Sequence, residues 1–121
     1  MSRPNPKPKA DKRRDPFTTA LRELRRTLPA RLPVRVRRCR LEHGTFGDCR
    51  LIEDEPQHFR VRVSSLYSSD AQVFALIHEW AHARAWFVED PDHDGHFGIE
   101  LARAWKVIGA GGEDDEHEDL A

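Results

Sequence analysis

The central segment of the chain reads Leu76-Ile77-His78-Glu79-Trp80-Ala81-His82-Ala83. It lies in a stretch, residues 70–87, that has no Pro or Gly. Ser69 followed three residues later by Gln72 is the capping-box pattern of a helix start. Because residues four apart share one face of a helix, we expect a long helix that presents His78 and His82 together.

The residues His78, Glu79 and His82 form an H-E-x-x-H motif. Two imidazoles one turn apart can bind one metal ion, and the glutamate beside the first reaches a water on that metal. Imidazole ligands suit zinc, and a catalytic zinc has a third protein ligand and one position left for water. The motif therefore predicts a Zn2+ cofactor. Glu79 is then the general base that takes the proton of the metal-activated water and passes it to the leaving amine.

The third ligand must come from downstream of the motif, where three residues compete. His93 precedes the predicted last helix, His96 lies three residues further on, and Glu100 is a helical carboxylate. Spacing alone leaves the choice among them open. A group that stabilises the oxyanion is also expected, and the candidates are Tyr67 and whichever of His93 and His96 is not a ligand.

The segments before this helix predict an α+β fold. Asp15 suits an N-cap and Pro16 the first position of an N-terminal helix. Alternating apolar and basic residues predict strands over residues 34–41 and 59–63, with a further strand over 46–52. Short connections between successive strands predict a three-stranded antiparallel sheet in which sequence neighbours pair.

The remaining segments divide the chain into one domain and two charged ends. A last helix is expected over residues 97–108, with Gly109 as its C-cap. Pro at every second position from 4 to 8 among basic residues predicts a disordered basic arm over residues 1–14. The acid-rich residues 111–121 predict a disordered tail, which leaves residues 15–110 as the single domain.

These motifs together resemble those of the SprT-like zinc metallopeptidases, including small phage and prophage members. In that family a helical H-E-x-x-H is followed by a loop and an H-G-x-x-F/W type segment whose histidine completes the zinc site. The corresponding segment here is His93-Asp94-Gly95-His96-Phe97-Gly98. The resemblance covers roughly residues 17–108. It implies a minimal zincin-like domain with zinc endopeptidase activity and makes His93 the third ligand.

The resemblance also bears on the substrate. The related Spartan peptidases cut proteins crosslinked to DNA and use additional DNA-binding segments, none of which is recognisable here. The Cys-rich zinc ribbon of longer relatives has no counterpart either, since no cysteine follows Cys49. DNA-associated proteins are therefore one candidate class of substrate rather than an implied one.

Charge is divided unevenly along the chain. Residues 1–40 contain 14 Lys or Arg and three acidic residues, a net charge of +11, and the remainder contains six and 18, a net charge of −12. Clustered Lys and Arg neutralise phosphates, so the basic N-terminal segment predicts a non-specific DNA contact. Pairing with the acidic tail and ordinary solubility are the alternatives.

The composition also suggests where the protein resides. No apolar run approaches the roughly 20 residues that a membrane-spanning helix needs. The first 15 residues have no apolar segment typical of a secretory signal, and two cysteines are too few for a disulfide framework. We expect a cytoplasmic monomer with no membrane partner.

Two functions fit these observations. The first is a zinc metallopeptidase that hydrolyses a protein or peptide substrate. The second is a nucleic-acid-binding or adaptor module with a purely structural zinc site. A peptidase substrate can bind by adding a strand to a sheet edge, and residues 59–63 form the predicted strand nearest to the motif in the sequence.

Overall fold

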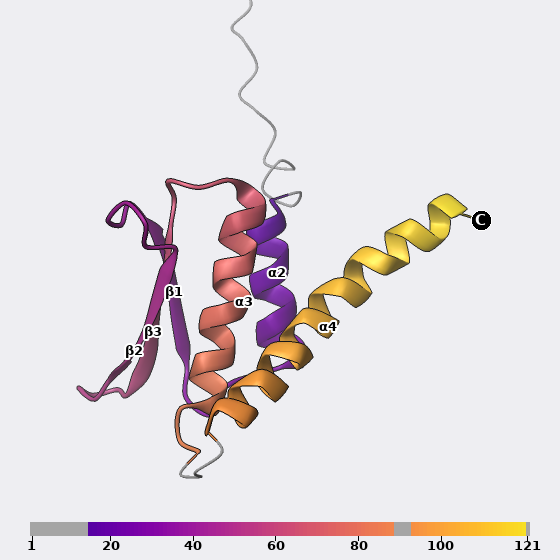
Figure 1. The fold of residues 1–121 in the computed structure, drawn as a ribbon. Helices are drawn as coiled ribbons and strands as arrows, with labels where there is room; N and C mark the ends of the chain where they lie inside the picture. Colours follow the sequence, from indigo (N-terminus) through magenta and orange to yellow (C-terminus); the bar gives the residue numbers. More distant parts are fainter. Residues whose placement is uncertain (1–14, 89–92, 121) are drawn as a thin grey trace, which may run out of the picture.

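The computed structural model describes residues 15–88 and 93–120, and the side chains described in the last helix are those of residues 95–109. In this part of the chain the elements follow the order α2 (Pro16–Thr27), β1 (Val34–Cys39), β2 (Gly47–Ile52), β3 (His58–Ser64), α3 (Ser69–Ala85) and α4 (His93–Leu120) (Figure 1). Three helices and one three-stranded sheet within these ranges confirm the predicted α+β class.

The sheet differs from the predicted antiparallel arrangement, which was wrong. Its strand order is β1-β3-β2, and β3 is antiparallel to β2 but parallel to β1. The central strand is β3, which has the most apolar inner face. Phe59, Val61 and Val63 of β3 are fully buried, whereas β2 has no buried residue. Residues 40–46 therefore cross the end of β3 to reach β2, instead of forming a tight turn between neighbours.

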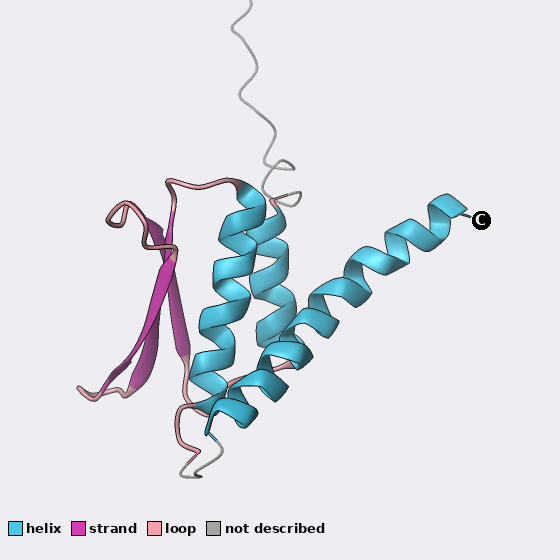
Figure 2. Ribbon diagram, viewed as in Figure 1, coloured by secondary structure: helices cyan, strands magenta, loops and turns pink. Residues whose placement is uncertain are grey.

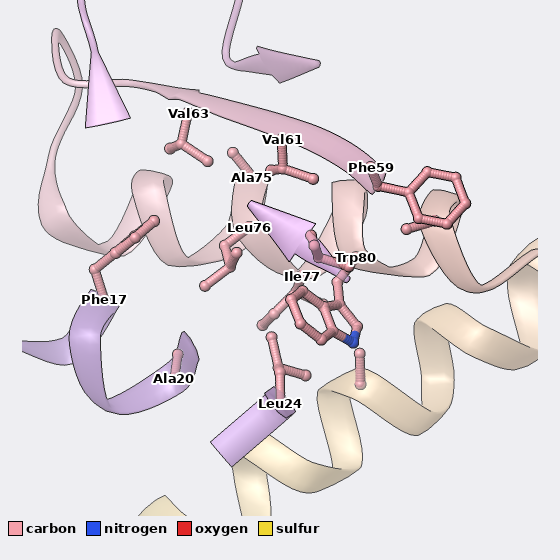
Figure 3. Packing of buried hydrophobic residues seen from close by; sticks show 13 residues of the cluster. Phe17, Ala20, Leu24, Phe59, Val61, Val63, Ala75, Leu76, Ile77 and Trp80 are labelled. Carbon is pink, nitrogen blue, oxygen red and sulfur yellow. The ribbon is translucent and has the colours of Figure 1, made fainter. Parts of the chain in front are cut away.

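All three helices lie on one face of the sheet (Figure 2). α3 packs directly on β2 and β3, and both α2 and α4 pack against α3. Buried side chains of α2, β3 and α3 meet in one core, which includes Leu24, Phe59, Ile77 and Trp80 (Figure 3). The indole nitrogen of Trp80 donates a hydrogen bond to the carbonyl oxygen of Leu28 at 2.8 Å. The tryptophan inside the motif thus ties α3 to the end of α2.

The helix starts follow local capping rules with one shift. Asp15 caps α2 as predicted. The N-cap of α3 is Ser68, one residue earlier than the predicted Ser69. Gln72 does not complete a capping box but donates from its side-chain amide to the carbonyl oxygen of Tyr67 at 2.9 Å. The helix that carries the motif is the one predicted, over Ser69–Ala85 rather than residues 70–87.

α4 is longer than the helix predicted over residues 97–108. Gly109 does not end it, because Gly44 is the only glycine among the described residues with the positive φ of a C-cap. The predicted basic arm, residues 1–14, lies outside the described residues, and the domain boundaries at 15–110 and 111–121 stay predictions. Within the described ranges, no helix has the length and apolar character needed to cross a membrane.

Candidate functional site

The two histidines of the motif lie one helical turn apart on α3. Nε2 of His78 and Nε2 of His82 are 3.2 Å apart, and the two rings meet at 70°. Nitrogen ligands at 2.0–2.1 Å from a tetrahedral zinc are about 3.3 Å from each other. The imidazole pair therefore already has the separation of two ligands of a single zinc ion.

Aromatic side chains pack around the imidazole pair. Phe97 of α4 stacks on His82 with ring centroids 4.2 Å apart and meets His78 edge-on at 5.1 Å. Phe74, one turn before His78 on α3, stacks on that histidine with ring centroids 6.4 Å apart. Its ring also packs against Trp105 of α4, with centroids 5.7 Å apart. These contacts hold both rings in place from α3 and from α4.

Glu79 is buried between α3 and the start of β2, with 8% of its surface exposed. Burial raises the pKa of its carboxyl to about 7, and the negative charge of Asp48 adds to the effect. Asp48 itself stays charged: hydrogen bonds from Arg62 lower the pKa of Asp48 against the opposing effect of burial. Glu79 is thus a weaker acid than a solvated carboxyl group and a stronger acid than an alcohol or an ammonium group.

Gly47, the first residue of β2, allows the strand to approach α3 at Glu79. An added Cβ would lie 2.8 Å from the backbone carbonyl oxygen of Arg62 and 3.4 Å from Cγ of Glu79. The first of these contacts is with rigid backbone, so any larger residue forces the strands apart.

We expect Gly47→Ala to destabilise the fold by about 1–3 kcal/mol, the usual cost of overpacking. Urea unfolding measures the effect. Gly98→Ala is the matched control, since a Cβ there meets nothing within 4 Å and Ala is the better helix former. Equal midpoints for wild type and Gly47→Ala would show that the strand relaxes without cost.

A cavity of about 500 Å³ opens beside the motif. One wall is the segment of residues 44–47 that leads into β2, and the other is formed by Ala71, Phe74 and Ala75 of α3. His78 and Glu79 also line it. The arrangement gives a ligand access to the glutamate and to one of the two imidazoles.

Cys49, two residues after Gly47, has a thiol that is a poor nucleophile in the folded chain. Burial raises the pKa of its thiol to about 12, and the charges of Glu79 and Asp48 contribute.

Because the thiolate is the nucleophile, we expect iodoacetamide at pH 8 to modify Cys49 at least about 100-fold more slowly in the folded than in the guanidinium-unfolded protein. A Cys39→Ser variant isolates this thiol for mass spectrometry, and equal rates would contradict its burial.

The three candidates for the third ligand have different surroundings. Glu100 accepts a hydrogen bond from Nε of Arg84 at 2.8 Å and lies 3.4 Å from Arg103, so its charge is used in the contact between α3 and α4. His96 is half-buried on α4. His93 is the first residue of α4, and its side chain lies outside the described residues. Among the side chains that the structure describes, no three His, Cys, Asp or Glu residues are grouped as a metal site.

Two other predicted features serve the scaffold. The Tyr67 hydroxyl accepts a hydrogen bond from the backbone N–H of Gly44 at 2.7 Å, so it holds the loop before β2. In the basic segment, Arg25 donates to the carbonyl oxygen of Val34 and Arg38 pairs with Asp15. These arginines stabilise the fold, and a DNA contact by the segment stays a prediction.

The predicted substrate strand, residues 59–63, belongs to β3, which is central and has partners on both sides. β2 is an edge strand beside Glu79 instead. Sequence reasoning also missed the cavity walls. Phe74 had a usable signal, because it lies four residues before His78 as His82 lies four after it. Phe46 and Gly47 had none, because their place depends on how the sheet pairs.

Comparison with known proteins gave no matching family model, no matching curated protein and no matching solved structure.

Proposed function

We propose that this protein is a zinc-dependent metallopeptidase of the SprT-like type that hydrolyses peptide bonds. The observation that carries the proposal is the 3.2 Å separation of the His78 and His82 nitrogens beside the buried Glu79, at one side of an open cavity. A structural zinc site surrounded by protein would not need a carboxylate that faces a cavity.

The chain offers a donor set that fits zinc. His78 and His82 would hold the ion together with His93, the residue that the resemblance assigns as third ligand. Bound zinc supplies a Lewis acid that lowers the pKa of water toward about 7 and polarises the scissile carbonyl. Phe97 and Phe74 keep the two imidazoles oriented, so little side-chain freedom is lost when an ion binds.

Glu79 acts as the general base of the proposed reaction. Its carboxylate accepts a proton from the attacking water and then gives it to the nitrogen of the leaving amine. Burial of Glu79 against Gly47 fixes the carboxylate at the side of the cavity and limits its contact with bulk water. Both effects favour transfer to the bound substrate over exchange with solvent.

The substrate backbone binds along β2. Within residues 15–88 and 93–120 this strand pairs only with β3, so its outer edge carries backbone groups that have no ladder partner in that part of the chain. An extended peptide can satisfy such an edge by adding a strand. Because Gly47 at the start of β2 and Glu79 line the same cavity, a peptide on this edge passes beside the proposed general base.

Zinc content and hydrolysis test the proposal together. We expect about one zinc ion per chain and cleavage of an unfolded protein that stops with a chelator and returns with added zinc. Protein with a full complement of zinc that cuts neither itself, an unfolded protein nor a DNA-bound protein, with and without DNA, would favour the structural-zinc alternative. The assays that include DNA also test whether DNA-associated proteins are substrates and whether the basic segment contacts DNA.

A further inference from the structure

The cavity beside Glu79 has walls that are apolar and unusually exposed. Phe46 on one wall is 52% exposed and Phe74 on the other is 53% exposed. Single exposed aromatic residues are common, but two that flank one cavity at a proposed reaction centre mark a binding surface. Apart from His78 and Glu79, none of the described residues that line the cavity has a side chain that ionises.

Small residues line the cavity beside the two rings. Ala71 and Ala75 are one turn apart on α3, and Gly47 lies opposite, where β2 comes so close to α3 that a Cβ added at Gly47 would lie 3.6 Å from Ala75 Cβ. A cavity of about 150 Å³ holds a benzene ring, so about 500 Å³ accepts a large side chain together with part of a peptide backbone.

The walls are held in place before any ligand arrives. The backbone carbonyl of Phe46 accepts a hydrogen bond from the N–H of Ser64 at 2.8 Å, and its ring packs on Tyr67 at 4.5 Å. The ring of Phe74 packs against Trp105 of α4 and against His78. A preformed apolar site binds without a large loss of side-chain freedom.

We propose that this cavity is a specificity pocket that selects a large apolar side chain, such as Leu, Phe or Met, on the residue next to the bond that is cut. Phe46, Phe74 and Ala71 are its specificity-determining residues. The inference rests on the proposed function for the position of the cut. A Lys or Asp side chain in this pocket would lose part of its hydration against the two aromatic rings, and Glu79 is already engaged with the attacking water.

A series of quenched peptides that differ at one position tests the selection. We expect kcat/KM for peptides with Leu or Phe next to the mapped cut to exceed that for Ala, Lys or Asp by at least about 10-fold. Ala71→Leu fills the pocket from α3 with a good helix former, so kcat/KM for the Leu and Phe peptides should fall to about that for the Ala peptide. Ile99→Ala, at a 51% exposed apolar residue of α4 outside the pocket, is the control and should keep the wild-type preference.

A binding measurement separates this inference from the proposed function. N-acetylleucinamide should shift the amide NMR signals of Gly47, Ala71 and Ala75 in the wild-type protein, N-acetyllysinamide should not, and Ala71→Leu should abolish the response. Shifts without any peptide cleavage would refute the peptidase and leave an apolar binding pocket. Cleavage with no preference among the peptides, or equal shifts by both amides, would overturn the pocket.

Discussion

Replacing Glu79 with Gln should lower kcat for peptide hydrolysis by about 10²- to 10⁴-fold while zinc remains bound, because general-base catalysis contributes a factor of that size. Gln has the shape of Glu but cannot accept the water proton. Its side chain still fits between α3 and Gly47, because it has nearly the same volume as that of Glu and the glycine has no Cβ. A Cβ added at Gly47 would lie 3.4 Å from Cγ of Glu79. The measurement is steady-state hydrolysis of a quenched peptide, alongside zinc content and a thermal melt.

The control for this variant is Glu23→Gln. Glu23 lies on α2 in an ion pair with Arg26, far in the sequence from the motif, and it is not among the described residues that line the cavity. It should keep wild-type activity. Equal activity of Glu79→Gln and wild type would remove Glu79 from the mechanism, whereas loss of zinc in Glu79→Gln would show that the substitution disturbs the site itself.

α4 connects the proposed site to the rest of the fold. Phe97 covers the two imidazoles, Glu100 pairs with Arg84 of α3, and Ala104 is fully buried in the core. These three positions are three or four residues apart, so they lie along one side of the helix. The Arg84–Glu100 ion pair, with both side chains mostly buried, fixes the position of α4 along α3. In this position Phe97 lies over the two histidines.

Local patterns in the sequence predicted the elements well. Asp15 and Pro16 define the start of α2 because capping depends on a few neighbouring atoms. His78 and His82 share a helix face because helical geometry alone brings residues four apart together. The antiparallel pairing of β2 with β3 was predicted correctly, but the pairing of β1 with β2 was predicted wrongly. The short connections favoured sequence neighbours, while burial of Phe59, Val61 and Val63 placed β3 in the centre.

The same division applies to the candidate site. The motif on α3 was evident from the sequence, since all of its residues lie in one helix. Gly47 and Phe46 join it only because residues 40–46 cross the end of β3 and return beside α3, which is a long-range consequence of the sheet order. No local pattern in residues 44–47 indicates that they face a glutamate more than 30 positions later.

Replacing His82 with Phe should weaken zinc binding by more than about 100-fold, which exceeds the loss caused by removing a partner that only orients a ligand. Phe keeps an aromatic ring to stack on Phe97, so the contact between α3 and α4 survives while the ligand nitrogen is lost. Peptide hydrolysis should fall to the level of chelator-treated wild type. Titration with a competing zinc indicator gives the affinity directly.

Thermal unfolding provides an independent reading of the same variant. Zinc at 100 times its dissociation constant stabilises a folded protein that binds it by about 2.7 kcal/mol, so the melting temperature of the wild type should rise with zinc. The His82→Phe variant should show no rise over the same zinc range. The control is His58→Phe at the start of β3, where Nδ1 of the native histidine lies 2.9 Å from the carbonyl oxygen of Pro56, and it should behave as wild type. If His82→Phe is stabilised by zinc as strongly as the wild type, the ion binds elsewhere. The 3.2 Å pair on α3 is then a packing feature of two histidines and not a metal centre.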